Sequence, residues 1–369
     1  MVKNKPSLLA VLHLPPPIHG ASMVGQYIKD SVLLNDTFET TFVNLTTSAS
    51  IDDIGKGFFK KLVPFFKLYF RVFNLLLKNK YDLCYMTINA KGVAFYKEMI
   101  VVLIVKMFKV KIIYHYHNKG IKDSKGNWLN NILYKYQFRN AKAILLSPLL
   151  YDDISSYLPH SNVSFCPNGI VERKESTLKQ FNKFKNTIPE ILFLSNMMET
   201  KGVYCLLDAC TLLHKKDFDF TVNFVGAESD ITANDFNAYV KKNDLQNKAF
   251  YLGKKYGDEK NVFFENSNVF VLPTYYHNEC FPLVILEAMS YGLSCISTNE
   301  GAIPEIIDDG ITGFIVPKNN AEILASKIEL LLLNDQLCEK MGNASKEKFN
   351  EKYTLSVFEK NFVEILSKN

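Results

Sequence analysis

Two glutamates, Glu279 and Glu287, stand with seven residues between them across the expected start of a helix. The apolar run 269–272 predicts a strand before them. Pro282 suits the first position of a helix, and the apolar residues after it continue with helical spacing. Glu279 would therefore lie in a loop, and Glu287 on the helix that follows.

A strand, a loop and a helix in this order can bind an anion in an open parallel sheet. Ligands bind beyond the carboxyl ends of the strands, and a helix N-terminus attracts negative charge. Two acids beside such a site would repel a phosphate unless they face hydroxyl groups. The pattern therefore indicates a ligand with both groups, such as a sugar nucleotide. The alternative is an ordinary helix start, with Glu279 a solvated loop acid and Glu287 a surface residue.

A second unit of strand, loop and helix follows directly along the chain. Residues 294–297 predict the strand, Gly301 lies in the loop, and Pro304 predicts the start of the next helix. Loops of neighbouring units of this kind would line one crevice.

These motifs resemble those of the retaining glycosyltransferases of family 4, of the bacterial surface-polysaccharide type. The resemblance implies an α/β fold of GT-B architecture, in which two Rossmann-like domains with doubly wound parallel sheets face a central cleft. The motifs follow the family's order along most of the chain and comprise 15–20, 167–169, Lys201-Gly202, Glu279, 287–292, 301–305 and 309–313.

Alternating strand and helix patterns indicate the same fold class. The polar segment 171–186 interrupts the alternation, and Pro189 precedes a new strand. We expect a first domain at 1–175, which the resemblance implies binds the acceptor, and a nucleotide-sugar domain at 187–352. Residues 353–369 are expected to form a helix that packs back on the first domain. Other expected helices include 21–34, 92–108 and 149–157.

The resemblance also assigns roles to single residues. Lys201 would hold the donor phosphates, Glu279 would contact the transferred sugar, and Glu287 would hold the ribose hydroxyls. In the family a Gly-Arg pair precedes this lysine, whereas this chain has Ser195 and Asn196 there. Asn196 can offer only a neutral hydrogen bond, so one charge-assisted contact of about 1.5–3 kcal/mol is missing.

Further donor contacts are expected from backbone groups. The leaving diphosphate would meet backbone N–H groups and the helix dipole at 280–283. In the amino-terminal half, Gly20 lies in a loop between a strand and a helix, where a glycine lets the backbone approach a ligand. The stretch 280–283 at the expected helix start comprises Cys280, Phe281, Pro282 and Leu283.

Two histidines, His115 and His117, fall on one face of an expected strand at 110–116. His117 matches the family's active-site histidine in position, which implies a hydrogen-bonding role near the transferred sugar. A His-x-His pair can bind a metal, but the sequence offers no third ligand. The alternative is a satisfied polar end of a strand.

Composition limits the class of protein. The chain has 369 residues, of which 47% are apolar and 22% charged, enough for two full cores. Its seven cysteines lack zinc spacing, which predicts reduced thiols in a cytosol and no structural metal. No secretory signal is evident, so we expect a cytoplasmic protein. The net charge of +5 is modest, and no nucleic-acid partner is expected.

Residues 56–80 interleave aromatic residues with seven basic residues and no acid. Such a helix can lie on an anionic membrane surface, although a core-facing helix with a solvated basic side fits as well. The apolar run 99–105 is too short to span a bilayer, and we expect it to be a buried helix. The protein would be peripheral on the inner face of the cell membrane at most.

These patterns together predict transfer of a sugar from a UDP- or GDP-linked donor to a saccharide acceptor, without metal or cofactor. The resemblance implies retention of configuration, through front-face attack in which the departing phosphate helps to take the acceptor's proton. The basic helix and the resemblance favour a lipid-linked acceptor in capsule or lipopolysaccharide synthesis. Three alternatives stay open: a GT-B sugar-nucleotide epimerase, a non-catalytic sugar-nucleotide-binding subunit, and a transferase with a soluble acceptor.

Overall fold

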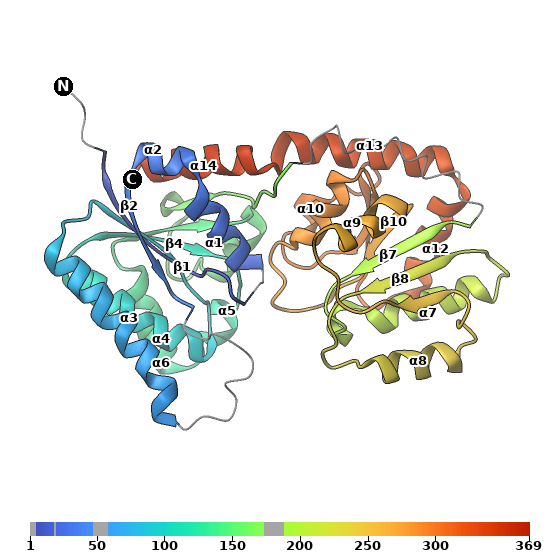
Figure 1. Cartoon of the computed structure of the whole chain (residues 1–369), viewed down its shortest axis with the longest axis horizontal. Coiled ribbons are helices and arrows are strands. Elements are labelled where there is room, and N and C mark those ends of the chain that lie inside the picture. The colour runs from blue at the N-terminus through green and yellow to red at the C-terminus, as the bar shows by residue number, and fades with distance from the viewer. Residues whose placement is uncertain (1–4, 18–19, 47–57, 173–187) are drawn as a thin grey trace. The chain divides into compact units, whose positions relative to one another are not determined.

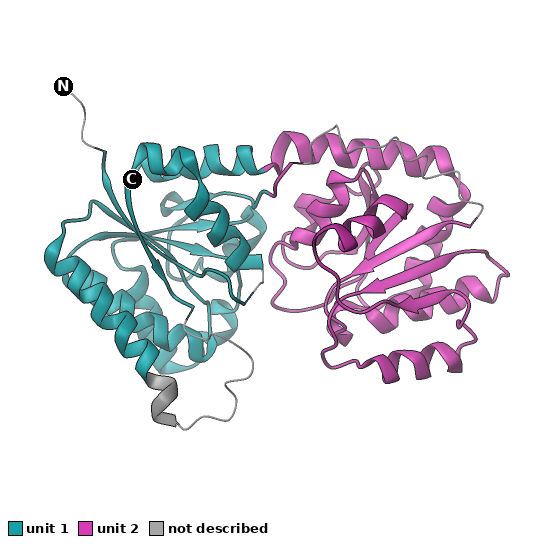
Figure 2. Ribbon diagram, in the orientation of Figure 1, with its two compact units in different colours: residues 1–169, 355–369 teal, residues 170–354 magenta. Residues whose placement is uncertain are grey.

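The computed structural model describes residues 5–17, 20–46, 58–172 and 188–369. The chain divides into two compact units, shown in different colours in Figure 2. Unit 1 comprises Met1–Gly169 and Leu355–Asn369, and unit 2 comprises Ile170–Thr354. The change of unit at residue 170 lies a few residues before the expected end of the first domain at 175. Most of the polar segment expected to separate the domains, residues 173–186 of 171–186, lies outside the described residues.

The described part of unit 1 contains a six-stranded parallel sheet with the strand order β2-β1-β3-β4-β5-β6 (Figure 1). Its inner strands are almost continuously apolar because a parallel sheet is covered by helices on both faces. All five residues of β3, for example, are buried. The strands are β1 Ser7–Leu12, β2 Glu39–Asn44, β3 Leu83–Thr87, β4 Lys111–Tyr116, β5 Ala141–Leu145 and β6 Val163–Phe165.

The helices of unit 1 differ from expectation in two places. The helix expected at 21–34 is two helices, because Ser31 accepts a hydrogen bond from the Leu34 N–H and begins the second one. The helix expected at 149–157 is a 3-10 helix, Pro148–Asp153, capped by Ser147. The α-helices are α1 Gly20–Asp30, α2 Val32–Thr37, α3 Phe58–Lys78, α4 Gly92–Met107, α5 Ile121–Ser124, α6 Trp128–Phe138 and α14 Leu355–Ser367.

Unit 2 is built on the same plan. Its described part contains a six-stranded parallel sheet with the order β12-β11-β10-β7-β8-β9. The strands are β7 Glu190–Leu194, β8 Thr221–Val225, β9 Ala249–Tyr251, β10 Val269–Leu272, β11 Ser294–Thr298 and β12 Gly313–Val316. The α-helices are α7 Val203–His214, α8 Ala233–Lys242, α9 Gly257–Asn266, α10 Leu283–Ser290, α11 Ile303–Ile306, α12 Ala321–Leu333 and α13 Asp335–Lys352.

Each sheet has one topological switch point, where the chain stops adding strands on one side of its first strand and begins to add them on the other side. In unit 1 the chain goes from β1 outward to β2 and then returns to β3 on the other side of β1. In unit 2 it goes from β7 to β8 and β9, and then returns to β10. At such a point the chain leaves two neighbouring strands towards opposite faces of the sheet, and a ligand can bind in the crevice beyond their carboxyl ends. The two doubly wound sheets confirm the expected α/β class, and they locate one candidate crevice in each unit.

The last helix, α14, belongs to unit 1 although it follows the whole of unit 2 in sequence. Its buried Phe362 packs edge-on against Tyr85 of β3, with ring centroids 4.9 Å apart. The same ring stacks on His115 of β4 at 6.3 Å. The chain end is thus part of the core of unit 1.

We predict that Phe362→Ala destabilises unit 1 by about 3–5 kcal/mol, because it removes a buried ring and leaves a cavity. Urea unfolding followed by circular dichroism measures the change. The exposed neighbour Lys360 provides the control, since Lys360→Ala should change stability by no more than about 0.5 kcal/mol. A Phe362→Ala variant as stable as the control would show that α14 does not pack in this way.

Candidate active site

The loops after β7 and β10 meet at the switch point of unit 2. The Tyr275 N–H donates to the Thr200 carbonyl at 2.8 Å, and the Thr274 hydroxyl donates to the same oxygen at 3.3 Å. Gly202 lets the loops come this close. Its φ of +87° is in the left-handed region, and a Cβ there would lie 2.3 Å from the Pro273 carbonyl oxygen. The expected Lys-Gly pair therefore has a structural reason for its glycine.

Lys201 and Glu279, predicted separately, form an ion pair between these two loops. The Lys201 ammonium donates to Oε2 of Glu279, and their side chains are 15% and 10% exposed. The Lys201 Nζ also lies 4.8 Å from the ring centroid of Tyr276, close enough for a cation–π contact. The alternative for Glu279, a solvated loop acid, is wrong, because the residue is buried and paired.

A third loop, after β11, supports the backbone beside Glu279. Gly301 has φ of +55°, and a Cβ there would lie 2.3 Å from the Glu279 carbonyl oxygen. The Ala302 N–H donates to the Cys280 carbonyl at 2.8 Å. In this loop Glu300 is buried and pairs with Lys318 at 2.6 Å. The conformation of 279–280 is therefore held from both sides, by the loops after β7 and β11.

Helix α10 begins directly after this backbone. Pro282 is its N-cap rather than its first helical residue, so the predicted start was one residue early. Cys280, Phe281 and Pro282 are buried, and Leu283 opens the helix. The first N–H groups of an α-helix have no partner inside the helix, so the first turn of α10 can donate to an anion.

Glu287, one turn further along α10, is half-buried and does not extend freely into solvent as the alternative supposed. Both of its carboxylate oxygens accept hydrogen bonds from the Lys260 ammonium, at 2.8 and 2.9 Å. Lys260 lies on α9 and was not predicted as a site residue. No local signal points to it, because the two residues are 27 positions apart and α9 is a polar helix.

Asn196 lies at the start of the loop that ends in Lys201. It is exposed, and its carbonyl accepts from the Met198 N–H at 2.8 Å. Its amide side chain is therefore on the same loop as the lysine, where the family has an arginine, but it carries no charge.

The remaining predicted residues lie in unit 1. His115 and His117 do share one face, with ring centroids 4.2 Å apart. His115 is fully buried, and its Nδ1 lies 2.8 Å from the Tyr85 hydroxyl. Burial, and then the neighbouring His117, hold the pKa of His115 well below its ordinary value. His117 is half-buried at the carboxyl end of β4, and Gly20 is exposed at the first position of α1.

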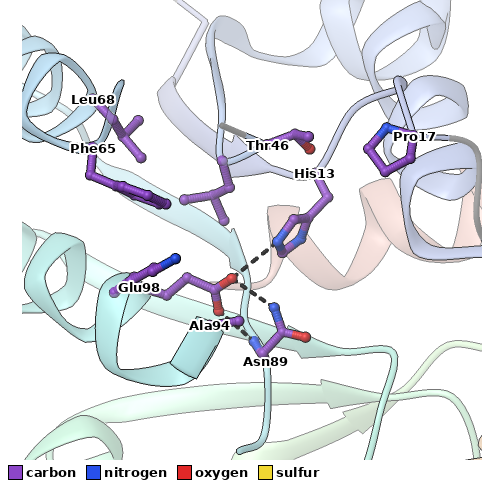
Figure 3. A pocket seen from close by; sticks show the side chains of 10 residues that line it. His13, Pro17, Thr46, Phe65, Leu68, Asn89, Ala94 and Glu98 are labelled. Carbon is purple, nitrogen blue, oxygen red and sulfur yellow. Dashed lines mark hydrogen bonds and ion pairs between the residues drawn. The ribbon is translucent and has the colours of Figure 1, made fainter. Parts of the chain in front are cut away.

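The switch point of unit 1 holds a pocket of about 220 Å³ that sequence reasoning missed (Figure 3). The buried Glu98 of α4 is its acidic centre. Oε1 of Glu98 lies 3.0 Å from Nε2 of His13 and accepts from Nδ2 of Asn89 at 2.7 Å. Oε2 accepts from the Asn89 N–H at 2.6 Å. Phe65 and Leu68 of α3 form an apolar wall.

This pocket is connected to the strand end that carries His117. The Asn118 amide donates to the Asn89 side-chain oxygen at 2.6 Å, and the Ala90 N–H donates to the Asn118 side-chain oxygen at 2.8 Å. His13 and Asn89 follow β1 and β3 closely, so their position after adjacent central strands could have identified them. Glu98 lies inside an apolar helix pattern and gave no comparable signal.

Within residues 5–17, 20–46, 58–172 and 188–369, no three His, Cys, Asp or Glu side chains are grouped so that they could hold a metal ion. The His115–His117 pair has no third ligand there.

Part of the chain resembles known proteins in sequence. Residues 174–348 match the family model described as Glycosyl transferases group 1, which covers most of unit 2. The capsular polysaccharide biosynthesis glycosyltransferase CapM of Staphylococcus aureus is 28% identical over 180 residues, which are 48% of this chain and 46% of CapM. The chain spans about half the length of the curated relatives it matches first.

Two solved structures resemble the chain over nearly its full length. A glycosyltransferase from Rickettsia africae is 21% identical, with a TM-score of 0.73 and 99% of each chain covered. The Anabaena protein HepE, solved in complex with UDP, is 15% identical, with a TM-score of 0.74 over 99% of this chain and 100% of HepE. These likenesses confirm the fold class expected from the resemblance, two doubly wound α/β units as in GT-B glycosyltransferases.

The lowered pKa of His115 predicts a pH dependence of stability. Below the ordinary histidine pKa near 6.5, the unfolded chain binds a proton that the folded chain does not, so stability falls as the pH falls from about 7 towards 5. The slope approaches about 1.4 kcal/mol per pH unit for this one group. Urea unfolding across this pH range should show a shallower slope for His115→Gln than for the wild type. Equal slopes in the two proteins would contradict the assignment.

Proposed function

We propose that the protein is a retaining glycosyltransferase of family 4 type that transfers a sugar from a nucleotide-diphosphate sugar to a saccharide acceptor. The observation that carries the proposal is the buried Lys201–Glu279 ion pair at the switch point of unit 2. It brings a cation for phosphate and an acid for sugar hydroxyls close to the amino end of α10. The family match and the likeness to CapM support a role in bacterial surface polysaccharide synthesis.

The leaving group determines what the site must stabilise. As the bond from the anomeric carbon to the diphosphate oxygen breaks, negative charge grows on the diphosphate. Lys201 and the first-turn N–H groups of α10 would meet this charge, with the dipole of the helix behind them. These groups belong to the chain, so we propose that neither metal nor cofactor is required. The donor would be a UDP- or GDP-linked sugar, and the HepE complex with UDP favours the former.

The ion pair itself provides a way to recognise the donor. Without donor, Glu279 is the partner of Lys201. A bound diphosphate would compete for the ammonium, which has three donor hydrogens, and the carboxylate would then accept hydrogen bonds from the sugar hydroxyls. Either residue alone would be a buried unpaired charge, which costs several kcal/mol. The two residues are therefore expected to act as one unit in donor binding.

Asn196 and Glu287 complete the proposed donor site. Glu287 would hold the ribose hydroxyls, and the two hydrogen bonds from Lys260 fix the position of its carboxylate. Asn196 would donate one neutral hydrogen bond to the phosphates in place of the family's arginine. Lys201 would therefore carry most of the cationic stabilisation.

The acceptor is proposed to bind unit 1. The pocket around Glu98 offers carboxylate and amide groups beside an apolar wall, which suits the hydroxyls and the carbon face of a sugar ring. His117 would lie next to the transferred sugar, in line with its position at the end of β4. We propose a lipid-linked saccharide acceptor and a cytoplasmic enzyme that is peripheral to the membrane, with residues 56–80 at the membrane surface.

We predict that Lys201→Met and Glu279→Gln each reduce turnover by about 10²–10³-fold, because each removes an interaction with the departing diphosphate or the transferred sugar. Transfer of labelled sugar to acceptor, with and without EDTA, measures this. Lys216→Met is the matched control, since it removes an exposed lysine paired with Glu329 and should retain activity. Unchanged turnover in folded variants of both residues would exclude them from the site.

The same assays separate the alternatives. A panel of UDP- and GDP-sugars should raise the melting temperature with the true donor, because a ligand that binds only the folded state stabilises it. Conversion of the donor without any acceptor would indicate an epimerase. Binding without transfer to any acceptor would indicate a non-catalytic subunit.

The proposed acceptor pocket gives a separate prediction. Ala94 lines the pocket and makes no side-chain hydrogen bond, so Ala94→Leu should fill the space without breaking the Glu98 network. We expect the KM for the acceptor to rise by about tenfold or more while the KM for the donor stays constant. Val93→Leu adds a methylene at an exposed neighbour that does not line the pocket, and should change neither constant in a detergent-solubilised assay. Equal effects of the two substitutions would remove the pocket from acceptor binding.

A further inference from the structure

Unit 1 exposes large apolar side chains along three helices, α3, α4 and α6. They include Phe66, Phe70, Ile100, Leu103, Trp128 and Ile132. Trp128 is 73% exposed, and the two phenylalanines are 65% and 67% exposed. These helices hold about half of the exposed large apolar residues in the described chain. Together these exposed faces are called the three-helix surface.

The helices that carry the three-helix surface lie side by side (Figure 1). The Tyr69 hydroxyl of α3 donates to the Lys97 carbonyl of α4 at 3.1 Å. The Tyr96 hydroxyl of α4 donates to the Asn130 side chain of α6 at 2.6 Å. Tertiary contacts thus fix the relative positions of the exposed apolar residues.

Helix α4 is apolar on two opposite faces. Met99, Val102 and Val105 are buried against the core, whereas Ile100 and Leu103 are 41% and 44% exposed. The prediction that 99–105 is a buried helix is therefore only half right. An apolar outer face is unfavourable in water, and exposed patches of this kind mark interaction sites.

The charges on the same helices are almost entirely basic. Exposed Lys67, Arg71 and Lys78 lie on α3, and Lys135 lies on α6. The single acid in the three helix sequences, Glu98, is buried in the pocket. The surface therefore combines apolar side chains with unopposed positive charge.

We propose that the three-helix surface binds an anionic lipid bilayer, with its apolar side chains among the lipid headgroups and its basic side chains at the phosphates. Each basic residue near such a bilayer adds about 1 kcal/mol of attraction. A second copy of the chain is a poorer partner, because two identical basic surfaces repel each other. In the described parts of the chain no helix is long and apolar enough to cross a membrane, so the contact is interfacial.

The proposal differs from a single basic helix at 56–80, because it requires α4 and α6 at the bilayer as well. Only the link between this surface and the acceptor rests on the proposed function. The pocket is lined by Phe65 and Leu68 of α3 and by Lys97 of α4, so a saccharide held there would lie beside the membrane that anchors its lipid.

Trp128 allows a direct test, since it is the chain's single tryptophan and lies on α6. The full-length protein is mixed with vesicles of phosphatidylcholine alone or with phosphatidylglycerol added. We expect cosedimentation and a blue shift of tryptophan emission with the anionic vesicles, and neither with phosphatidylcholine alone. Raised salt should weaken binding. Absence of cosedimentation overturns the proposal. Cosedimentation without an emission shift excludes α6 from the contact, and it overturns the proposal that all three helices bind the bilayer.

Matched variants locate the surface. Ile100→Glu, on the outer face of α4, should lower the vesicle partition coefficient on the order of tenfold, since it places a negative charge at the anionic surface. Ile311→Glu, at an isoleucine of unit 2 that is 61% exposed, should leave binding unchanged. Analytical ultracentrifugation tests self-association, and a dimer that Ile100→Glu dissociates, with no vesicle binding, would overturn the proposal. Vesicle binding needs no donor or acceptor. It can therefore fail while transfer to a soluble acceptor persists, and it can persist while transfer fails.

Discussion

The ion pair between Lys201 and Glu279 is the interaction on which the candidate active site depends. It joins the loop after β7 to the loop after β10. The topological switch point of unit 2 lies between these two strands. Gly202 and Gly301 allow the backbones around the pair to approach closely, so the loops converge instead of spreading into solvent. A cation and an acid are thereby held together, largely out of water, before any ligand arrives.

The pairing explains how a positive and a negative charge can both be buried at one small site. A lone buried lysine would be costly to desolvate, and a lone acid would repel phosphate. Paired, each neutralises the other, and in the proposed function a ligand with both phosphate and hydroxyl groups would replace the contact. The second pair, Lys260 with Glu287, has the same composition but is more exposed, so we propose that it positions a carboxylate and does not stabilise a leaving group. With the neutral Asn196 on the loop before Lys201, the proposed phosphate site would depend heavily on a single lysine.

The sequence predicted the fold class, and the loop and helix that carry Glu279 and Glu287, because those signals are local. A buried strand, a glycine or proline loop and a helix period identify Glu279, Glu287 and Lys201 by their distance along the chain. Their partners depend on tertiary packing, and Lys260 reaches Glu287 only because α9 lies near α10 in the fold. The break at Ser31 was missed because a capping serine inside a helical apolar pattern is a weak signal. His13 and Asn89 also lie just beyond the carboxyl ends of strands, so the rule that located Lys201 could have located them.

Helix α4 shows why apolar periodicity alone could not decide between core and membrane. An all-round apolar helix fits burial in protein and contact with lipid equally, since both environments exclude water. The neighbouring helices favour lipid contact, because α3 and α6 carry exposed lysines and an arginine that the core of a protein would leave unpaired. The same helix carries Glu98 into the pocket between β1 and β3. The proposed saccharide pocket and the proposed lipid-binding surface would therefore share one rigid element, as an acceptor with both a sugar and a lipid part would require.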